Sequence, residues 1–415
     1  MRIIKSLVAA AAVAAVAAGM AVAPAMAEPI NPHTGKLQNP PNAWDIVGVG
    51  SESTTFVVGG LTYAYDSAIK KDTPANPYIY SWDAVPPGNM NDTTQQIVVK
   101  HGCKKNLRPN GSSAGITALV GGYGNTSYTY KGKKHTVPCL DFARSSRPRK
   151  TTDPSFGPGG VAFVVMAGDA VTYSATNLKG EKTNVPNNLS LAQLTEIFGC
   201  TVPKAHGFNA NTWGALLGSG AKGASQAIDP ILPQAGSGTL SFWATTALGL
   251  TSTSEPTCGS AASLSVPNQP EENEGTSNVF RIGDKKTGKP NPNVIYPFSV
   301  GAFVAQAYHD AKCGHKPTKK QNRFGCDING ILGLDGISGV VPTVKGPGGI
   351  PVTNPKWSST KFHRFLYNVV PYATTADHIP SYLEKFFGRK GYFCKQTTIL
   401  KDYGFEPTAG CGLTS

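Results

Sequence analysis

The stretch Pro233-Gln234-Ala235-Gly236-Ser237-Gly238-Thr239 leads directly into Leu240-Ser241-Phe242-Trp243-Ala244, an apolar run compatible with a helix. Glycines let the backbone bend and approach a ligand closely. Free N–H groups at the start of a helix attract anions, and Ser237 and Thr239 would add hydroxyl donors. The stretch therefore indicates either an anion-binding loop or a tight loop that caps a helix.

Three other polar loops have a similar character. The run Asp45–Gly50 looks like a strand that enters the loop Ser51–Thr55. Further on, Gly111-Ser112-Ser113-Ala114-Gly115 opens into an expected helix, and Leu140–Arg147 adds a polar loop with guanidinium groups. Repetition of the same loop chemistry favours a ligand site over isolated helix caps.

Strand-like and helix-like segments alternate along the chain. Apolar, β-branched runs predict strands, and Ser190 with Gln193 forms a capping box for a helix over 191–198. The remaining expected strands are 97–99, 161–167, 294–296 and 365–370, and the remaining expected helices are 300–311 and 382–387. Residues 265–293 are polar and are interpreted as a surface excursion. This order predicts an α/β fold with mainly parallel pairing.

The first 27 residues have the form of a secretion signal. Arg2 and Lys5 precede an apolar core, and Ala25-Met26-Ala27 is a small-residue cleavage site. We expect cleavage near Ala27 and a flexible lead-in over 28–44. No later stretch is long and apolar enough to span a bilayer, so we expect an extracellular or periplasmic protein, monomeric and without stable membrane insertion.

Cysteine content and charge fit such a location. Eight cysteines in an exported chain predict disulfides, although eight cysteines allow 105 pairings. Sequence order favours nearest-neighbour bridges: Cys103–Cys139, Cys200–Cys258, Cys313–Cys326 and Cys394–Cys411. The sequence contains no Cys-x-x-Cys pair, a common pattern of zinc sites. We therefore expect neither a metal nor a cofactor. The net charge of +13 suits an anionic ligand, a cell wall or nucleic acid.

The ordered set of loops resembles the phosphate-binding proteins of bacterial ABC importers, which have the type 2 periplasmic-binding-protein fold. The resemblance rests on 50–54, 111–115, 141–146 and 236–239, and more loosely on 296–299 and 364–370. It implies two α/β lobes, each a mainly parallel sheet flanked by helices, that close on a ligand. Crossings near Met166 and Tyr296 would give lobe one residues 45–165 and 297–415, and lobe two residues 166–296.

The resemblance also implies site residues. The expected donors come from all four loops, and Arg144 is expected to contact the ligand as well. The full expected set is Ser53, Thr54, Ser112, Ser113, Arg144, Ser145, Ser146, Ser237, Gly238 and Thr239. Many aligned hydrogen bonds of this kind can hold a dehydrated anion.

The chain departs from the family in two places. Pro233 and Ala235 stand where the family often has Arg and Asp, and Arg144 could replace the lost guanidinium. The second departure is in the third loop. The family has an aspartate that accepts a proton from bound phosphate, where this chain has Ser146. A carboxylate in the site rejects sulfate, which has no proton to offer, so discrimination against sulfate should be weak. Glu52 is the residue that could replace the lost acceptor, and the alternative for Glu52 is a solvated loop carboxylate.

Enzyme and nucleic-acid hypotheses fit less well. Gly111-x-Ser113-x-Gly115 matches a nucleophile-elbow pattern, but Arg108-Pro109-Asn110 precedes it instead of a buried strand. Gly283-x-x-x-x-Gly288-Lys289 resembles a phosphate loop, but Pro290 takes the place of the magnesium-binding hydroxyl. The basic stretches lack interleaved aromatic residues, so we expect no nucleic-acid partner.

The sequence thus predicts a secreted solute-binding protein, not an enzyme, for an inorganic oxyanion, with phosphate first. An ABC importer permease would be its partner. The alternative is an extracellular binding or structural protein that kept the fold and uses its basic surface on cell wall or anionic polymers.

Overall fold

An eight-stranded mixed sheet runs through the molecule, with the strand order β10-β13-β8-β18-β7-β1-β2 and with β14 also paired to β8. The computed structural model describes residues 28–86, 92–254, 256–259, 269–282, 288–309, 330–346, 349 and 351–415. The strands of this sheet are β1 (Ile46–Gly50), β2 (Ile79–Ser81), β7 (Phe142–Ser145), β8 (Val161–Ala175), β10 (Asp229–Pro230), β13 (Val294–Ser299), β14 (Gly333–Leu334) and β18 (His363–Pro371).

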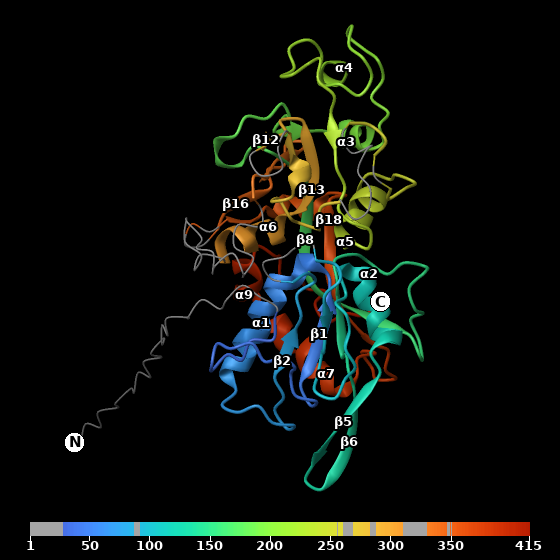
Figure 1. Cartoon of the computed structure of the whole chain (residues 1–415), viewed down its shortest axis with the longest axis vertical. Coiled ribbons are helices and arrows are strands. Elements are labelled where there is room, and N and C mark those ends of the chain that lie inside the picture. The colour runs from blue at the N-terminus through green and yellow to red at the C-terminus, as the bar shows by residue number, and fades with distance from the viewer. Residues whose placement is uncertain are drawn as a thin grey trace, which may run out of the picture.

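Helices flank the sheet at both of its ends (Figure 1). They are α1 (Thr55–Ala68), α2 (Gly111–Thr117), α3 (Leu191–Phe198), α4 (Trp213–Leu217), α5 (Gly238–Ser241), α6 (Val300–Val304), α7 (Ser381–Phe387), α8 (Tyr392–Lys395) and α9 (Thr397–Asp402). Short two-stranded pairs lie outside the large sheet: β3 (Gln96–Ile97) with β4 (Asn106–Leu107), β5 (Asn125–Tyr130) with β6 (Lys133–Pro138), β9 (Asn188–Leu189) with β15 (Gly336–Ile337), β11 (Arg281–Ile282) with β12 (Lys289–Pro290), and β16 (Thr343–Lys345) with β17 (Pro351–Thr353).

The predicted α/β class is confirmed, with parallel strand pairs at the two ends of the large sheet and antiparallel pairs between them. Strands β2, β1 and β7 pair in parallel at one end of the sheet, and β10 and β13 pair in parallel at the other. Between them, the long strands β8 and β18 are antiparallel to each other and to their outer neighbours. The two long strands therefore join two parallel units, as Figure 1 shows along the vertical axis.

Strand β8 contributes to two separate cores. Ala162, Val164 and Met166 belong to one buried cluster, together with apolar residues of α1 and α7. The second half of β8, including Val171 and Tyr173, belongs to a second buried cluster with α3 and the segment after α5. This division agrees in kind with two lobes, and boundaries at Met166 and Tyr296 stay a prediction.

Local sequence signals account for several elements. Helix α3 has the predicted bounds, and both hydrogen bonds of its capping box between Ser190 and Gln193 are present. The predicted helix over 300–311 is a shorter α6, followed by a wider π-type turn over Ala305–His309. Residues 310 and 311, the last two of the predicted helix, lie outside the described part of the chain.

Three predicted disulfides are formed: Cys103–Cys139, Cys200–Cys258 and Cys394–Cys411. The fourth pair, Cys313 with Cys326, and the signal segment 1–27 lie outside the described residues. None of the helices described is both long and apolar enough to cross a bilayer.

The segment 28–44 is not the flexible lead-in that we expected. Glu28 is buried and forms an ion pair of 2.6 Å with Arg108. At the other end, the Asn42 amide and the Trp44 indole both donate to Asp72. Polar side chains therefore fix this proline-rich stretch to the body of the protein.

Candidate anion-binding site

One carboxylate oxygen lies at the point where three of the predicted loops meet. Glu272 Oε1 accepts hydrogen bonds from Ser53 Oγ (2.7 Å), Ser146 Oγ (3.1 Å), and both Thr239 N (3.0 Å) and Thr239 Oγ1 (2.6 Å). All four residues are buried. Hydrogen bonds to a charged acceptor are stronger than those between neutral groups, so the cluster presents four donors to one carboxylate oxygen.

Arg364 supports the same hydroxyls from the opposite side. Its guanidinium donates to Thr239 Oγ1 (3.0 Å), to Ser53 Oγ (3.2 Å) and to Ser146 O (2.9 Å). A hydroxyl that accepts from a guanidinium has its own proton free to point elsewhere. The protons of Ser53 and Thr239 are thereby directed at Glu272.

Strand pairing positions Arg364. It lies on β18 directly opposite Asp169 on β8, and the two side chains form a buried ion pair of 2.8 Å. The guanidinium also stacks at 5.6 Å over the ring of Phe242. Two long strands and an aromatic ring therefore hold a positive charge beside the hydroxyl cluster.

Close packing of glycines brings the loops together. A Cβ atom on Gly238 would lie 2.1 Å from Ser146 Oγ and 2.5 Å from Ser112 Oγ. Gly111 has a φ of +86°, and a Cβ there would lie 2.8 Å from the carbonyl oxygen of Gly236. The loops that carry Ser112 and Ser146 can therefore contact the 236–239 loop only because both sides have glycine.

Ser112 stands at the edge of the cluster. Its Oγ accepts from Ser146 N (3.1 Å) and lies 3.3 Å from Ser146 Oγ. Ser51, which we had not singled out, donates from its own hydroxyl to Ser146 Oγ at 2.9 Å. Both serines orient Ser146 without touching Glu272 themselves.

We expected Arg144 to contact the ligand, but its guanidinium donates to other groups. Its five N–H groups donate to Ser51 O, Gly50 O, Trp82 O, Thr55 Oγ1 and Ser81 Oγ. Since a guanidinium has five N–H donors, none remains for a ligand. Arg144 instead holds the end of β1 and the start of the first loop, and the guanidinium that donates to the hydroxyl cluster is that of Arg364.

Four other expected donors have local hydrogen bonds. Ser237 Oγ caps α5 by accepting from Leu240 N (3.0 Å), and Thr54 Oγ1 donates to Ser51 O. Ser145 Oγ donates to Arg147 O (2.8 Å), whereas Ser113 Oγ accepts from the Arg147 guanidinium (3.1 Å). These side chains shape the loops and do not reach the central oxygen.

Glu52 is buried, not solvated. Its Oε2 accepts from the amide of Asn273 at 2.9 Å. Burial and, second, the nearby charge of Glu272 raise the pKa of Glu52 well above its usual range. A protonated Glu52 would be a donor, and an ionised one an acceptor, so its role as acceptor for phosphate stays a prediction.

The segment 269–275 was misread in the sequence. We interpreted 265–293 as a surface excursion because it is polar, but Glu271, Glu272, Asn273 and Glu274 are all buried. Three glutamates in four positions are unusual for a buried turn, and this is the signal that could have identified it. Arg364 within an apolar strand run was a second available signal.

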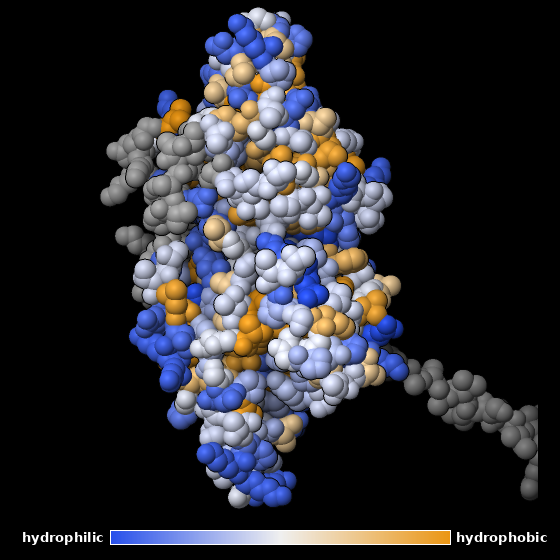
Figure 2. All heavy atoms as spheres, turned by 90° about the vertical axis from the view of Figure 1, so that its right-hand side faces the viewer, coloured by the Kyte–Doolittle hydropathy of each residue, from blue (hydrophilic) through white to orange (hydrophobic). Residues whose placement is uncertain are grey.

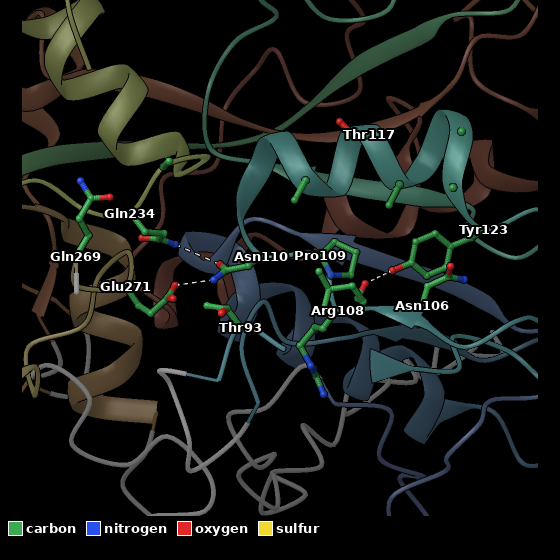
Figure 3. Close-up of a pocket in the computed structure, with 16 residues that line it drawn as sticks. Thr93, Asn106, Arg108, Pro109, Asn110, Thr117, Tyr123, Gln234, Gln269 and Glu271 are labelled. Carbon is green, nitrogen blue, oxygen red and sulfur yellow. Dashed lines mark hydrogen bonds between the residues drawn. The ribbon is translucent and has the colours of Figure 1, made fainter. Parts of the chain in front are cut away.

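A cavity of about 770 Å³ lies beside the cluster (Figure 3). Asn110 lines it between Glu271 and Pro109, and its side-chain amide donates to Glu271 Oε2 (2.8 Å) and accepts from Gln234 (3.2 Å). The cavity therefore opens next to the residue that precedes Glu272. Within the described ranges, no group of three or more His, Cys, Asp and Glu side chains could hold a metal ion.

No family model matches the chain, and no curated protein matches it in sequence. Solved structures that resemble it include an ABC-type phosphate transport receptor from Vibrio cholerae (13% identity, TM-score 0.46, covering 87% of this chain and 99% of that one). A phosphate-binding protein from Stenotrophomonas maltophilia matches at 12% identity and TM-score 0.39 (88% and 91% covered). A periplasmic phosphate-binding protein of the DING type, solved with phosphate, matches at 14% and 0.37 (88% and 91% covered).

These similar structures are phosphate-binding proteins, the kind of protein that the loops resemble.

Proposed function

We propose that the protein is a non-catalytic solute-binding protein that holds an inorganic oxyanion, phosphate first, between its lobes. The observation that carries the proposal is the convergence of four hydrogen bonds on Glu272 Oε1 from Ser53, Ser146 and Thr239. A phosphate oxygen is negatively charged like a carboxylate oxygen and could accept hydrogen bonds from the same donors. Arg364 behind them supplies a buried positive charge for the anion.

The proposed setting is outside the cytoplasm. The basic n-region, apolar core and cleavage site at the start of the chain support export. The disulfides formed in the structure suit an oxidising compartment. An ABC importer permease is the proposed partner, and it would receive the anion from the closed form.

Titration calorimetry with inorganic phosphate tests the proposal. We expect wild-type protein to bind phosphate, and Ser53→Ala and Thr239→Val to bind it about tenfold more weakly or worse. A hydrogen bond to a charged group contributes about 1.5–3 kcal/mol, and about 1.4 kcal/mol corresponds to a tenfold change. Ser237→Ala, which removes only a helix cap, is the matched control. Equal affinities in all four proteins would contradict the proposed site.

A second candidate function has its own observation. The hairpin β5–β6 projects from the lower end of the molecule (Figure 1), and the lower tip of the molecule is hydrophilic in Figure 2. Lys131, Lys133 and Lys134 are exposed on it, and residues 93–140 include no Asp or Glu. We propose that this basic arm binds anionic polymers of the cell surface, as the basic composition suggested.

Retention on immobilised long-chain polyphosphate tests the second candidate. The triple change of Lys131, Lys133 and Lys134 to Gln should elute at lower salt than wild type, because fewer counterions are released on binding. Changing the exposed pair Lys70 and Lys71 to Gln, on the turn after α1, is the control for net charge. If the elution salt falls by the same amount per lysine removed in both variants, the arm binds polyphosphate no better than other basic surface does.

A further inference from the structure

The side chain of Glu272 fills the anion site incompletely. Oε1 accepts all four hydrogen bonds, whereas Oε2 is buried and has no hydrogen-bond partner among the residues described. A buried polar atom without a hydrogen-bond partner destabilises the arrangement that buries it. The donors therefore suit an anionic oxygen, but this carboxylate as a whole is a poor match for its surroundings.

The segment that carries Glu272 is held by hydrogen bonds from β13 and from the turn after α6. Tyr296 donates to the carbonyl of Glu271 (2.7 Å), Ser299 N donates to Asn273 Oδ1 (2.8 Å), and Gln306 donates to the carbonyl of Asn273 (2.9 Å). These anchors lie on β13 and just after α6. Two of them reach backbone carbonyls and the third reaches the Asn273 side chain, and none involves the side chain of Glu272, so that side chain can leave while the segment stays attached.

Toward the first two loops, the same segment makes only side-chain contacts. Glu271 accepts from Asn110 (2.8 Å), and Asn273 donates to Glu52 (2.9 Å) and to Ser53 (3.0 Å). Together with Glu272, they bridge the two sides of the cleft. The bridge therefore fastens the lobes together in the way that a bound ligand does.

The charges beside the site oppose simultaneous occupancy. An oxyanion at the donors would share the pocket with Glu272 and would have Glu52 next to it, and like charges at short range repel strongly in a buried site. The cavity of about 770 Å³ next to Asn110 and Glu271 provides space outside the cluster. Asn110 and Glu271 line this cavity, and Glu271 directly precedes Glu272, so the cavity is the nearest described space into which the displaced side chain of Glu272 could move.

We infer that Glu272 is a built-in competitor of the anion: its carboxylate takes the ligand's place, closes the lobes without ligand and must be displaced for binding. The inference rests on the proposed function and deepens it. The affinity of wild-type protein for an external anion is then reduced by the fraction of molecules that have Glu272 in the site. Removing the carboxylate removes that competition.

Phosphate titrations of wild type, Glu272→Gln and Glu272→Ala test the inference. We expect both variants to bind phosphate at least about tenfold more tightly than wild type. If the carboxylate of Glu272 occupies the site in nine-tenths of the wild-type molecules, the apparent affinity for phosphate is reduced about tenfold. The control is Glu274→Gln, which removes a carboxylate from the same segment whose bonds are to Thr276. It should bind like wild type.

The outcomes separate the two proposals. Equal affinity in wild type and both Glu272 variants would overturn the competitor role and leave the anion site standing. No binding of phosphate or sulfate by any folded variant would overturn the proposed function and the competitor role together.

Small-angle scattering gives a second, independent readout. Wild type should have the same radius of gyration with and without phosphate, because Glu272 already closes it. Glu272→Ala should be larger without phosphate and contract when phosphate is added. A variant as compact as wild type in the absence of phosphate would contradict closure by Glu272.

Discussion

At the scale of single residues, two buried arginines show how position decides role. Arg144 donates all its N–H groups to the loops around β1, whereas Arg364 shares its donors among Asp169 and the hydroxyls of the site. Both are buried, and the sequence favoured Arg144 because it lies in a polar loop. The strand residue Arg364 is the one that contacts the hydroxyl cluster.

Ser146 is the residue at which ligand choice can be tested. It lies 3.1 Å from the central oxygen and donates to it. We expect Ser146→Asp to raise the phosphate-to-sulfate affinity ratio, because the new carboxylate can accept the proton of phosphate and repels sulfate. Paired titrations with the two anions give the ratio.

Glu52→Gln is the companion variant for the same measurement. If Glu52 already serves as acceptor, this change should lower the phosphate-to-sulfate ratio, and Ser146→Asp should add little. An unchanged ratio in both variants would show that neither residue faces the bound anion.

At the scale of elements, the sequence predicted what local chemistry determines. The capping box set α3, β-branched runs set β8 and β18, and glycine with small hydroxyl residues marked the three loops that meet. Three long-range disulfides were also predicted correctly, but the surroundings of the buried charged side chains were not. The burial of Glu272 and the pairing of Arg364 with Asp169 arise from the register of β8 and β18 and from the path of 269–275, which no local pattern specifies.

Helix α5 tests whether the close approach of the loops matters. Gly238→Ala would place a Cβ atom 2.1 Å from Ser146 Oγ, and a Ser146 backbone carbon lies 3.1 Å away. We expect the loops to separate and phosphate affinity to fall about tenfold or more, through loss of at least one bond to the charged ligand. Calorimetry measures the affinity.

Gly121→Ala is the matched control, because no atom lies within 4 Å of a Cβ at that position. It should leave phosphate affinity unchanged. If Gly238→Ala also binds phosphate as wild type does, the contact between α5 and Ser146 is not needed for the site.

At the scale of the whole molecule, the buried acids of segment 269–275 link stability to pH. Burial, as the largest cause, raises the pKa of both Glu271 and Glu274 from 4.5 to about 7. Between these values the folded protein binds protons that the unfolded chain has released. The free energy of unfolding contributed by these groups is therefore present below about pH 4.5 and is lost as pH rises through about 7.

Urea unfolding at pH 5 and pH 7.5 checks this linkage. The double variant Glu271→Gln, Glu274→Gln should lose less stability between the two pH values than wild type does, because the amides do not titrate. Glu181→Gln, at an exposed carboxylate, should follow wild type. A double variant with the wild-type pH dependence would mean that both acids are ionised throughout this range.

The most direct measurement of the central claim is a crystal structure of Glu272→Gln grown with phosphate. We predict a tetrahedral anion within hydrogen-bond distance of Ser53 Oγ, Ser146 Oγ, and the N and Oγ1 of Thr239, with the side chain of the substituted residue withdrawn. If the substituted side chain instead keeps the position of the Glu272 carboxylate among these donors, and no anion occupies the cleft at saturating phosphate, the claim that this cluster is an anion-binding site is contradicted.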